Sequence, residues 1–210
     1  ALRLSEEAVR IADDYGWSED PALLTALAAG AMALVWLGRF EEAESWLERA
    51  ERTLHPDGEP GSELVFHATR GLLFLARTRL EEALMAFQAA ERMQSLLASK
   101  HAFLLPVRAR LIQTQARMGD LVSARAALVQ LSEEERDTAA IRGAAAEIRL
   151  AENDPEQALD VLAPVIDRGG AGGRAAVIDD RATAAGRCGA RSARGAARGG
   201  GIPGAGAGHC

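Results

Sequence analysis

Cysteine and lysine are scarce in this chain. Among its 210 residues there are only two cysteines, Cys188 and Cys210, and both lie near the end. No disulfide framework can hold the body of the chain together, so a reducing, cytoplasmic setting is our default expectation. Lys100 is the only lysine among 24 basic residues, and the others are arginines, whose codons are GC-rich. We interpret this bias as the codon usage of a GC-rich genome.

Long apolar runs, strand patterns and aromatic residues are also rare. No run approaches the roughly 18 apolar residues that cross a bilayer, and no stretch alternates as a half-buried strand does. Aromatic residues make up 4% of the chain, although 48% of its residues are hydrophobic. The core must therefore consist mainly of Leu and Ala, which favour helices. These absences predict an all-α fold without a membrane span.

Positive charge is lacking from most of the chain. Residues 1–167 carry 17 basic and 28 acidic residues, a net charge of −11, whereas residues 168–210 carry 7 Arg and 2 Asp, a net charge of +5. The acidic body should be repelled by nucleic acid phosphates. We therefore predict no direct nucleic acid contact by this chain.

Patterns that indicate catalysis or metal binding are missing. No serine lies in a G-x-S-x-G elbow, and no histidine belongs to an H-E-x-x-H motif or another metal-ligand spacing. The acidic runs 13–14 and 133–135 fall at predicted helix ends, and carboxylates at a helix N-terminus already interact favourably with the macrodipole. We predict no enzyme, no catalytic residue, no metal site and no cofactor. Surface or packing roles are expected for the four histidines, which are His55, His67, His101 and His209.

An internal repeat is present instead. Residues 37–52 read LGRFEEAESWLERAER, and residues 77–92 read RTRLEEALMAFQAAER. The alanine of the shared E-E-A element marks an anchor that recurs at Ala43, Ala83, Ala124 and Ala158, with spacings of 40, 41 and 34 residues. Ala1 lies 42 residues before the first of these anchors. A recurring unit of this length predicts a stack of supersecondary units.

Each anchor begins a helical packing stripe. An apolar residue follows it after four residues, and a small or apolar residue follows after seven, except that Ser5 interrupts the first, partial copy. Positions 0, 4 and 7 share one face of a helix. We expect repeat packing through Ala43, Leu47, Ala50, Ala83, Phe87, Ala90, Ala124, Leu128, Ala158 and Leu162.

A second apolar helix precedes each of these stripes. Gly38 and Gly119 mark helix ends, proline follows an N-cap aspartate at residues 20–21 and 154–155, and Ser132 with Glu135 has capping-box spacing. About nine helices in antiparallel pairs are therefore predicted over residues 1–167. One pair buries too little surface alone, so neighbouring pairs should stack into an α-solenoid. The preceding helices are expected at residues 21–38, 62–79, 105–119 and 133–152.

The stripe resembles helix B of the tetratricopeptide repeat, whose helix A contributes a small and then a large residue. Here the small position falls on Ala31, Gly71, Ile112 and Ala146, and the large one on Leu34, Phe74, Gln115 and Arg149. The first two repeats fit this pattern, whereas Ile112, Gln115 and Arg149 depart from it. The resemblance implies a right-handed, tetratricopeptide-like α-solenoid.

The long repeats and the sequence pattern of residues 37–52 resemble the helical-repeat region of MalT-like, LuxR-family ATP-dependent transcriptional regulators. That family implies a bacterial, cytoplasmic module for signal transduction, flanked by a nucleotide-binding module and a helix-turn-helix. Neither a G-x-x-x-x-G-K-[ST] loop nor a helix-turn-helix pattern occurs here, and the chain begins at Ala1 without Met, so we expect a fragment. The alternative is a free-standing tetratricopeptide scaffold for protein assembly.

Helix A lines the concave groove in the tetratricopeptide family. A protein, a peptide, a partner helix or a small-molecule inducer would bind there, and self-association through the repeats is a further possibility. The groove carries no Lys or Asn, which argues against a chaperone adaptor. By resemblance, the partner-binding positions are Thr25, Met32, Trp36, Thr69, Leu72, Arg110, Gln113, Arg117 and Glu147.

The segment 168–210 departs from the helical pattern. It contains 13 Gly, 12 Ala and 7 Arg in 43 positions. Three interpretations remain: a flexible linker, an Arg-Gly tail for nucleic acid, or a GC-rich gene read out of frame. The tail has no aromatic residue for base stacking, which weakens the second, and we favour the third. In each case we expect a disordered, low-complexity tail after the repeat domain of residues 1–167.

Overall fold

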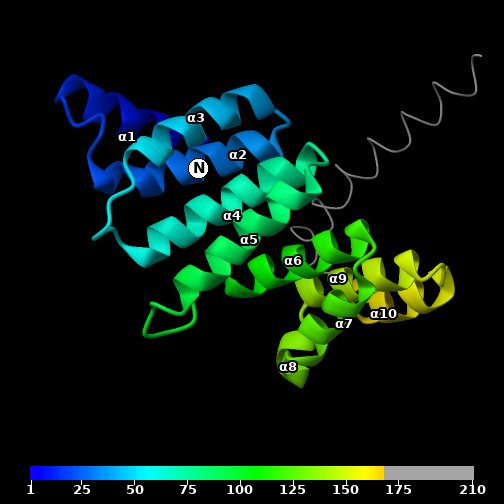
Figure 1. The fold of residues 1–210 in the computed structure, drawn as a ribbon. Coiled ribbons are helices and arrows are strands. Elements are labelled where there is room, and N and C mark those ends of the chain that lie inside the picture. Colours follow the sequence, from blue (N-terminus) through cyan, green and yellow to red (C-terminus); the bar gives the residue numbers. More distant parts are fainter. Residues whose placement is uncertain (168–210) are drawn as a thin grey trace, which may run out of the picture. The chain divides into compact units, whose positions relative to one another are not determined.

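A computed structural model describes residues 1–167 as ten α-helices and one short 3-10 turn, one α-helix more than predicted (Figure 1). These residues contain no strand, which confirms the all-α prediction for this part of the chain. None of the described helices combines the length and apolar character needed to cross a membrane. The prediction of a disordered tail at 168–210 lies outside the described residues. The helices are α1 (Leu2–Asp14), α2 (Leu24–Trp36), α3 (Phe40–Arg52), α4 (Pro60–Ala76), α5 (Leu80–Gln94), α6 (Leu104–Met118), α7 (Leu121–Val129), α8 (Glu133–Arg136), α9 (Ala139–Ala151) and α10 (Pro155–Asp167), and the turn η1 is Pro21–Leu23.

The extra helix comes from a break in the segment 133–152, which was predicted as one helix. Thr138 has an extended backbone with φ −71° and ψ 147°, and this residue separates α8 from α9. Its hydroxyl donates a hydrogen bond to the carbonyl oxygen of Glu135 at 2.7 Å, while Arg142 pairs with the Asp137 carboxylate. Side-chain hydrogen bonds to nearby backbone groups compete with the hydrogen bonds that continue a helix. This competition explains why the segment forms two helices and not the predicted one.

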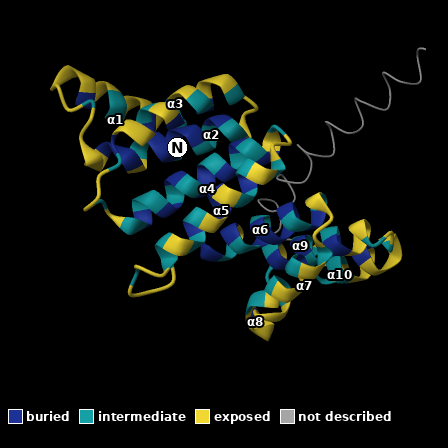
Figure 2. Cartoon of the chain, in the orientation of Figure 1, coloured by how far each residue is buried: buried dark blue, intermediate teal, exposed yellow. Residues whose placement is uncertain are grey.

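Helices adjacent in the sequence make the main contacts. The pairs α2–α3, α4–α5, α6–α7 and α9–α10 each pack together, and α2 packs on α4 and α6 on α9. Between the second and third pairs the arrangement differs, because α6 packs mainly on α5 and little on α4. Figure 2 shows buried residues along α2, α4, α6 and α9, and each of these helices has at least four. These four first helices, together with α5, which also has four buried residues, form most of the interior of the described fold.

The turn inside each helix pair has the same backbone geometry. The fifth residue before each anchor alanine has a positive φ, and it is Gly38 (74°), Thr78 (59°), Gly119 (83°) or Asn153 (62°). This left-handed residue ends the first helix and allows the chain to reverse. The next N–H then donates to the carbonyl oxygen five residues earlier, as in Arg39 to Leu34 at 2.9 Å, Arg79 to Phe74 at 2.9 Å, Asp120 to Gln115 at 3.0 Å and Asp154 to Arg149 at 2.9 Å.

The second helix of each pair places its anchor alanine in the interior. Ala43, Ala83 and Ala124 have no exposed surface, and Ala158 is 3% exposed. Among the ten residues of the expected packing stripe, only Leu128 and Leu162 are partly exposed. Small residues at the anchor let the two helices of a pair approach closely.

Glycine creates space for an aromatic ring in the first two pairs. A Cβ added to Gly71 of α4 would lie 2.5 Å from the ring of Phe87, which is 1% exposed on α5. Similarly, the Trp46 ring of α3 occupies the space where Gly30 of α2 would carry a side chain. In each contact the aromatic ring packs directly against the backbone at the glycine, where a side chain would not fit. Packing therefore requires glycine at both positions.

Candidate partner-binding face

The nine predicted partner-binding residues differ in their access to solvent. Thr25 and Trp36 of the segment 24–36 are exposed, with 51% of Trp36 accessible. Thr69 and Gln113 are buried. The remaining five are partly exposed: Met32, Leu72, Arg110, Arg117 and Glu147. We call the seven accessible residues the first-helix face, because they lie on α2, α4, α6 and α9.

Thr69 is a correction to the expected groove. It has no exposed surface, because α4 packs on α2 at this point. Its hydroxyl donates to the carbonyl oxygen of Val65 at 2.8 Å and lies 3.5 Å from that of Ala28. Thr69 therefore stabilises the contact between two first helices and does not offer a surface to a partner.

Gln113 is a second correction, with a similar cause. It is 5% exposed on α6, which packs on α9. Its side-chain oxygen accepts a hydrogen bond from Arg110 Nη1 at 3.0 Å. A buried amide needs such a partner, so Gln113 supports the neighbouring arginine from beneath.

The first-helix face changes character along the chain. Counted eleven residues before each anchor alanine, one column of positions reads Met32, Leu72, Gln113 and Glu147. It is apolar on α2 and α4 and polar on α6 and α9. The equivalent positions of the first two pairs and the last two pairs therefore differ in chemistry.

An ion pair joins the two polar first helices. Arg117 Nη2 of α6 lies 2.8 Å from Glu147 Oε1 of α9, and these side chains are only 21% and 17% exposed. Arg117 Nε is buried and has no hydrogen-bond partner within residues 1–167. Because the guanidinium has five N–H groups, this arginine retains donor capacity beside the pair.

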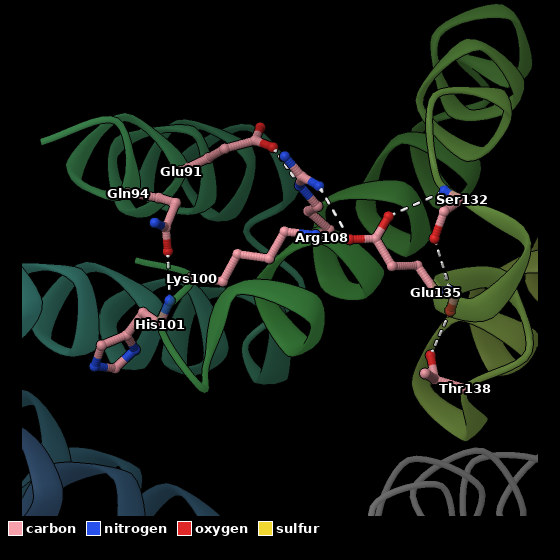
Figure 3. A network of polar contacts seen from close by, with 8 residues as sticks. All are labelled: Glu91, Gln94, Lys100, His101, Arg108, Ser132, Glu135 and Thr138. Atoms are coloured by element: carbon pink, nitrogen blue, oxygen red, sulfur yellow. Dashed lines mark hydrogen bonds and ion pairs between the residues drawn. The ribbon is translucent and has the colours of Figure 1, made fainter. Parts of the chain in front are cut away.

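A second polar network, drawn in Figure 3, connects the loop after α5 to α6 and α8. Glu135 Oε1 lies 2.8 Å from Lys100 Nζ and 3.9 Å from Arg108 Nη1, while Arg108 Nε donates to Glu91 at 2.9 Å. The predicted capping box is present, since Ser132 Oγ accepts from Glu135 N at 3.2 Å and Glu135 Oε2 from Ser132 N at 3.0 Å. The sequence assigned Glu135 a helix-terminal role only.

Hydrogen bonds control the protonation of Glu135. The Lys100 ammonium contributes most and the backbone N–H of Ser132 contributes next, so the pKa of the Glu135 carboxyl lies below its ordinary value. The carboxylate is charged at neutral pH and holds two cations. Glu135 therefore links α8 to the loop after α5 through Lys100 and to α6 through Arg108.

His67 of α4 lies in a packed environment, as predicted for a histidine with a packing role. Burial, followed by the charges of Arg70 and Arg92, lowers the pKa of its imidazole. Its ring packs against Phe66 with centroids 5.1 Å apart. Within residues 1–167, no group of three or more His, Cys, Asp or Glu side chains is placed to hold a metal ion.

A hollow of about 220 Å³ between α3 and α4 has five charged side chains in its lining, and all of them except Glu48 pair with other side chains of the chain. Arg70 lies 2.7 Å from Glu51 and beside the rings of Phe66 and Phe74, with its guanidinium carbon 6.0 and 5.7 Å from their centroids. Arg79 lies over the Phe74 ring at 4.5 Å and pairs with a glutamate of its own turn. Most of these charges are compensated within the chain, whereas Thr25 and Trp36 of the first-helix face are exposed, so we favour that face as the binding surface.

Comparison with known proteins adds no relative: no family model, no curated protein and no solved structure matches this chain.

Proposed function

We propose that this chain is a non-catalytic helical-repeat module that binds a protein, a peptide or a small inducer on its first-helix face. The observation that carries the proposal is the column of Met32, Leu72 and Glu147, where accessible side chains from three helices change from apolar to charged. A face with both kinds of side chain suits an amphipathic ligand. Burial of apolar groups supplies affinity, and charge pairing sets the orientation.

The proposed architecture is a right-handed, tetratricopeptide-like α-solenoid. Four helix pairs with the same left-handed turn support it, and so does the packing of one first helix on another in α2–α4 and α6–α9. Small-angle X-ray scattering of the 210-residue chain tests this part. An elongated, curved particle is expected for the repeat domain, and a closed bundle would contradict the proposal.

We further propose that the module is the sensor part of a LuxR-family, MalT-like transcriptional regulator. The resemblance of residues 37–52 and the long repeat spacing support it. The sequence of the genomic locus is the test. An upstream nucleotide-binding module and a downstream helix-turn-helix would favour the regulator, whereas a short gene would favour the alternative, a free-standing scaffold for protein assembly.

Selection of short random peptides displayed on phage tests the binding face directly. Peptides enriched on the full chain should lose affinity for the double variant Trp36→Ala/Arg117→Glu, since Trp36 is half-exposed and Arg117 lies beside Glu147. The control is Met85→Ala, which removes an exposed apolar side chain (59%) from α5, outside the face. Equal binding to all three proteins would refute the assignment of this face.

A further inference from the structure

Another hollow, of about 270 Å³, lies between the third and fourth helix pairs. Its walls come from α7, α9 and α10 and from the short α8 segment that connects the two pairs. Pockets that hold drug-sized ligands usually have volumes of about 300–1,000 Å³, so an occupant of this hollow must be small. The lining residues are Leu128, Glu133, Arg136, Asp137, Arg142, Ala145 and Val161.

Three helices contribute apolar side chains to this hollow. Leu128 belongs to α7, Ala145 to α9 and Val161 to α10, and each of these residues is partly exposed. The hollow therefore offers an apolar wall that is built from both helix pairs.

The hollow between α3 and α4 occupies the equivalent place between the first two pairs. Leu47 and Leu128 both lie four residues after an anchor alanine, and Arg70 and Ala145 both lie thirteen residues before the next one. Arg70 lines the earlier hollow and pairs with Glu51. Because the side chain of Ala145 ends at its Cβ, the later hollow has an apolar wall where the earlier one has a guanidinium group.

Two opposite charges of α8 also line the later hollow. Glu133 and Arg136 are exposed, and within residues 1–167 neither side chain has a hydrogen-bond or ion-pair partner. Their spacing would allow them to pair, since Glu7 and Arg10 of α1 have the same order and spacing and lie 2.6 Å apart. The carboxylate and the guanidinium at the hollow are therefore both available to a ligand.

The other two charged residues of the lining compensate each other. Arg142 Nη2 pairs with the carboxylate of Asp137, and Arg142 Nη1 donates a hydrogen bond to the carbonyl oxygen of Val161 at 3.1 Å. Arg142 thus joins α9 to α10 and to the end of α8, and it supports the walls of the hollow. One acid and one base, Glu133 and Arg136, are left uncompensated beside an apolar wall.

We propose that this hollow binds a free apolar α-amino acid such as leucine. Its carboxylate would accept hydrogen bonds from Arg136, and its ammonium group would donate to Glu133. Its side chain would pack against Leu128, Ala145 and Val161, and burial of this apolar surface adds affinity. A zwitterion carries its two charges on neighbouring groups, which matches an acid and a base placed one helical turn apart. None of the lining residues belongs to the first-helix face, so this site is additional to the function proposed above.

Isothermal titration calorimetry of the full chain with L-leucine tests the class of ligand. N-acetyl-leucine lacks the ammonium group, leucinamide lacks the carboxylate and the free amino acid glycine lacks the apolar side chain. Each of these three should bind about tenfold or more weakly than leucine, because each loses one of the proposed contacts. The absence of leucine binding, or equal affinity for leucine and any of the three analogues, would overturn the proposal.

Substitutions in the lining test the place of binding. Ala145→Leu should abolish leucine binding because it fills the hollow, and the fold should tolerate it, since the equivalent place holds Arg70. Glu133→Gln should weaken binding by about tenfold or more. Glu134→Gln is the matched control on the same helix, because Glu134 does not line the hollow, and it should leave binding unchanged. Circular dichroism verifies that each variant is folded. Normal leucine binding by folded Ala145→Leu, or equal affinities of the Glu133→Gln and Glu134→Gln variants, would refute this site.

Discussion

The pairs α2–α3 and α4–α5 differ in packing chemistry from the pairs α6–α7 and α9–α10. In the first two, an aromatic ring fills the space beside a glycine, as Phe87 does over Gly71. At the positions of Gly71 and Phe87, counted from the anchors, the later pairs have Ile112 with Leu128 and Ala146 with Leu162. In α2–α3 these positions hold Ala31 and Leu47, and its glycine and ring, Gly30 and Trp46, lie one residue earlier in each helix. The side chains that fill the space between the two helices thus differ from pair to pair. The comparison teaches that one backbone arrangement accepts several ways of filling the same seam.

The turns differ in the same way. Arg39 and Arg79 precede α3 and α5 and pair with the glutamate three residues later, whereas Asp120 before α7 accepts a hydrogen bond from the N–H of Ser123 at 3.1 Å. Asp154 accepts one from Gln157 N at 3.1 Å. The turn backbone is the same in all four pairs, while its local support changes from side-chain ion pairs to N-caps.

The largest expected effect follows from the aromatic seam. Phe87→Ala should lower the free energy of unfolding by about 3–5 kcal/mol, because it leaves a cavity over a residue that has no side chain. Leu128→Ala, at the equivalent site of a later pair, should cost about 1–2 kcal/mol, since Leu128 is partly exposed. Urea denaturation followed by circular dichroism measures both. Equal losses would mean that the two seams do not differ in energy.

Alanine substitution of glycine should have opposite signs in the two regions. In Gly71→Ala the new Cβ meets the Phe87 ring at 2.5 Å, and we expect a net loss of about 1–2 kcal/mol after the better helix propensity of alanine is included. In Gly143→Ala the nearest atom is Gln113 Nε2 at 3.8 Å, an ordinary contact. That variant should gain up to about 1 kcal/mol. Thermal melts of both variants distinguish the signs, and destabilisation by both would contradict the comparison.

The ion pair between Arg117 of α6 and Glu147 of α9 can be removed with Glu147→Gln. Arg117 then loses its carboxylate partner, and we expect a cost of about 1 kcal/mol, because both side chains retain some solvent. Glu44→Gln is the control in the earlier pairs. Arg77 lies 2.6 Å from Glu44 but also 3.5 Å from Glu41. Because this second carboxylate remains, Glu44→Gln should lower the free energy of unfolding by less than Glu147→Gln. An equal or larger cost for Glu44→Gln in urea denaturation would contradict this account.

The smallest effect is a pH dependence at Glu135. Its pKa is lowered in the folded state, so its contribution to stability is complete above the ordinary glutamate pKa and is lost as the pH falls through the lowered value. The wild type should therefore lose stability below about pH 4.3 more steeply than Glu135→Gln, which keeps an amide at the capping-box position. Urea midpoints between about pH 7 and pH 3 measure the slope. Equal slopes for the wild type and Glu135→Gln would contradict this role of Glu135.

Regular features of the fold could be predicted because they depend on neighbours in sequence. Gly38 and Gly119 were placed at helix ends, and the Ser132–Glu135 capping box was recognised from its spacing. Thr78 was not recognised as a left-handed residue, since a β-branched side chain rarely adopts that conformation. Its hydroxyl donates to the carbonyl oxygen of Arg77 at 2.6 Å, a local contact with no sequence signature.

Features that depend on distant contacts could not be predicted. The pairing of Lys100 with Glu135 spans 35 residues, and its partners are separated by α6 and α7. Thr69 and Gln113 were assigned to a groove by their helical position, but burial depends on how closely the next first helix approaches. Sequence periodicity predicts which residues share a face of a helix, whereas the extent to which that face is buried depends on tertiary packing.

The placement of the tryptophans has an optical consequence. All three tryptophans of the chain lie between residues 17 and 46, and two of them, Trp17 and Trp36, are more than half exposed. Intrinsic fluorescence therefore reports on α1 to α3, whereas far-ultraviolet circular dichroism averages over every helix. The chain carries its own spectroscopic label at one end, so unfolding that begins at the other end is visible as dichroism lost before fluorescence changes.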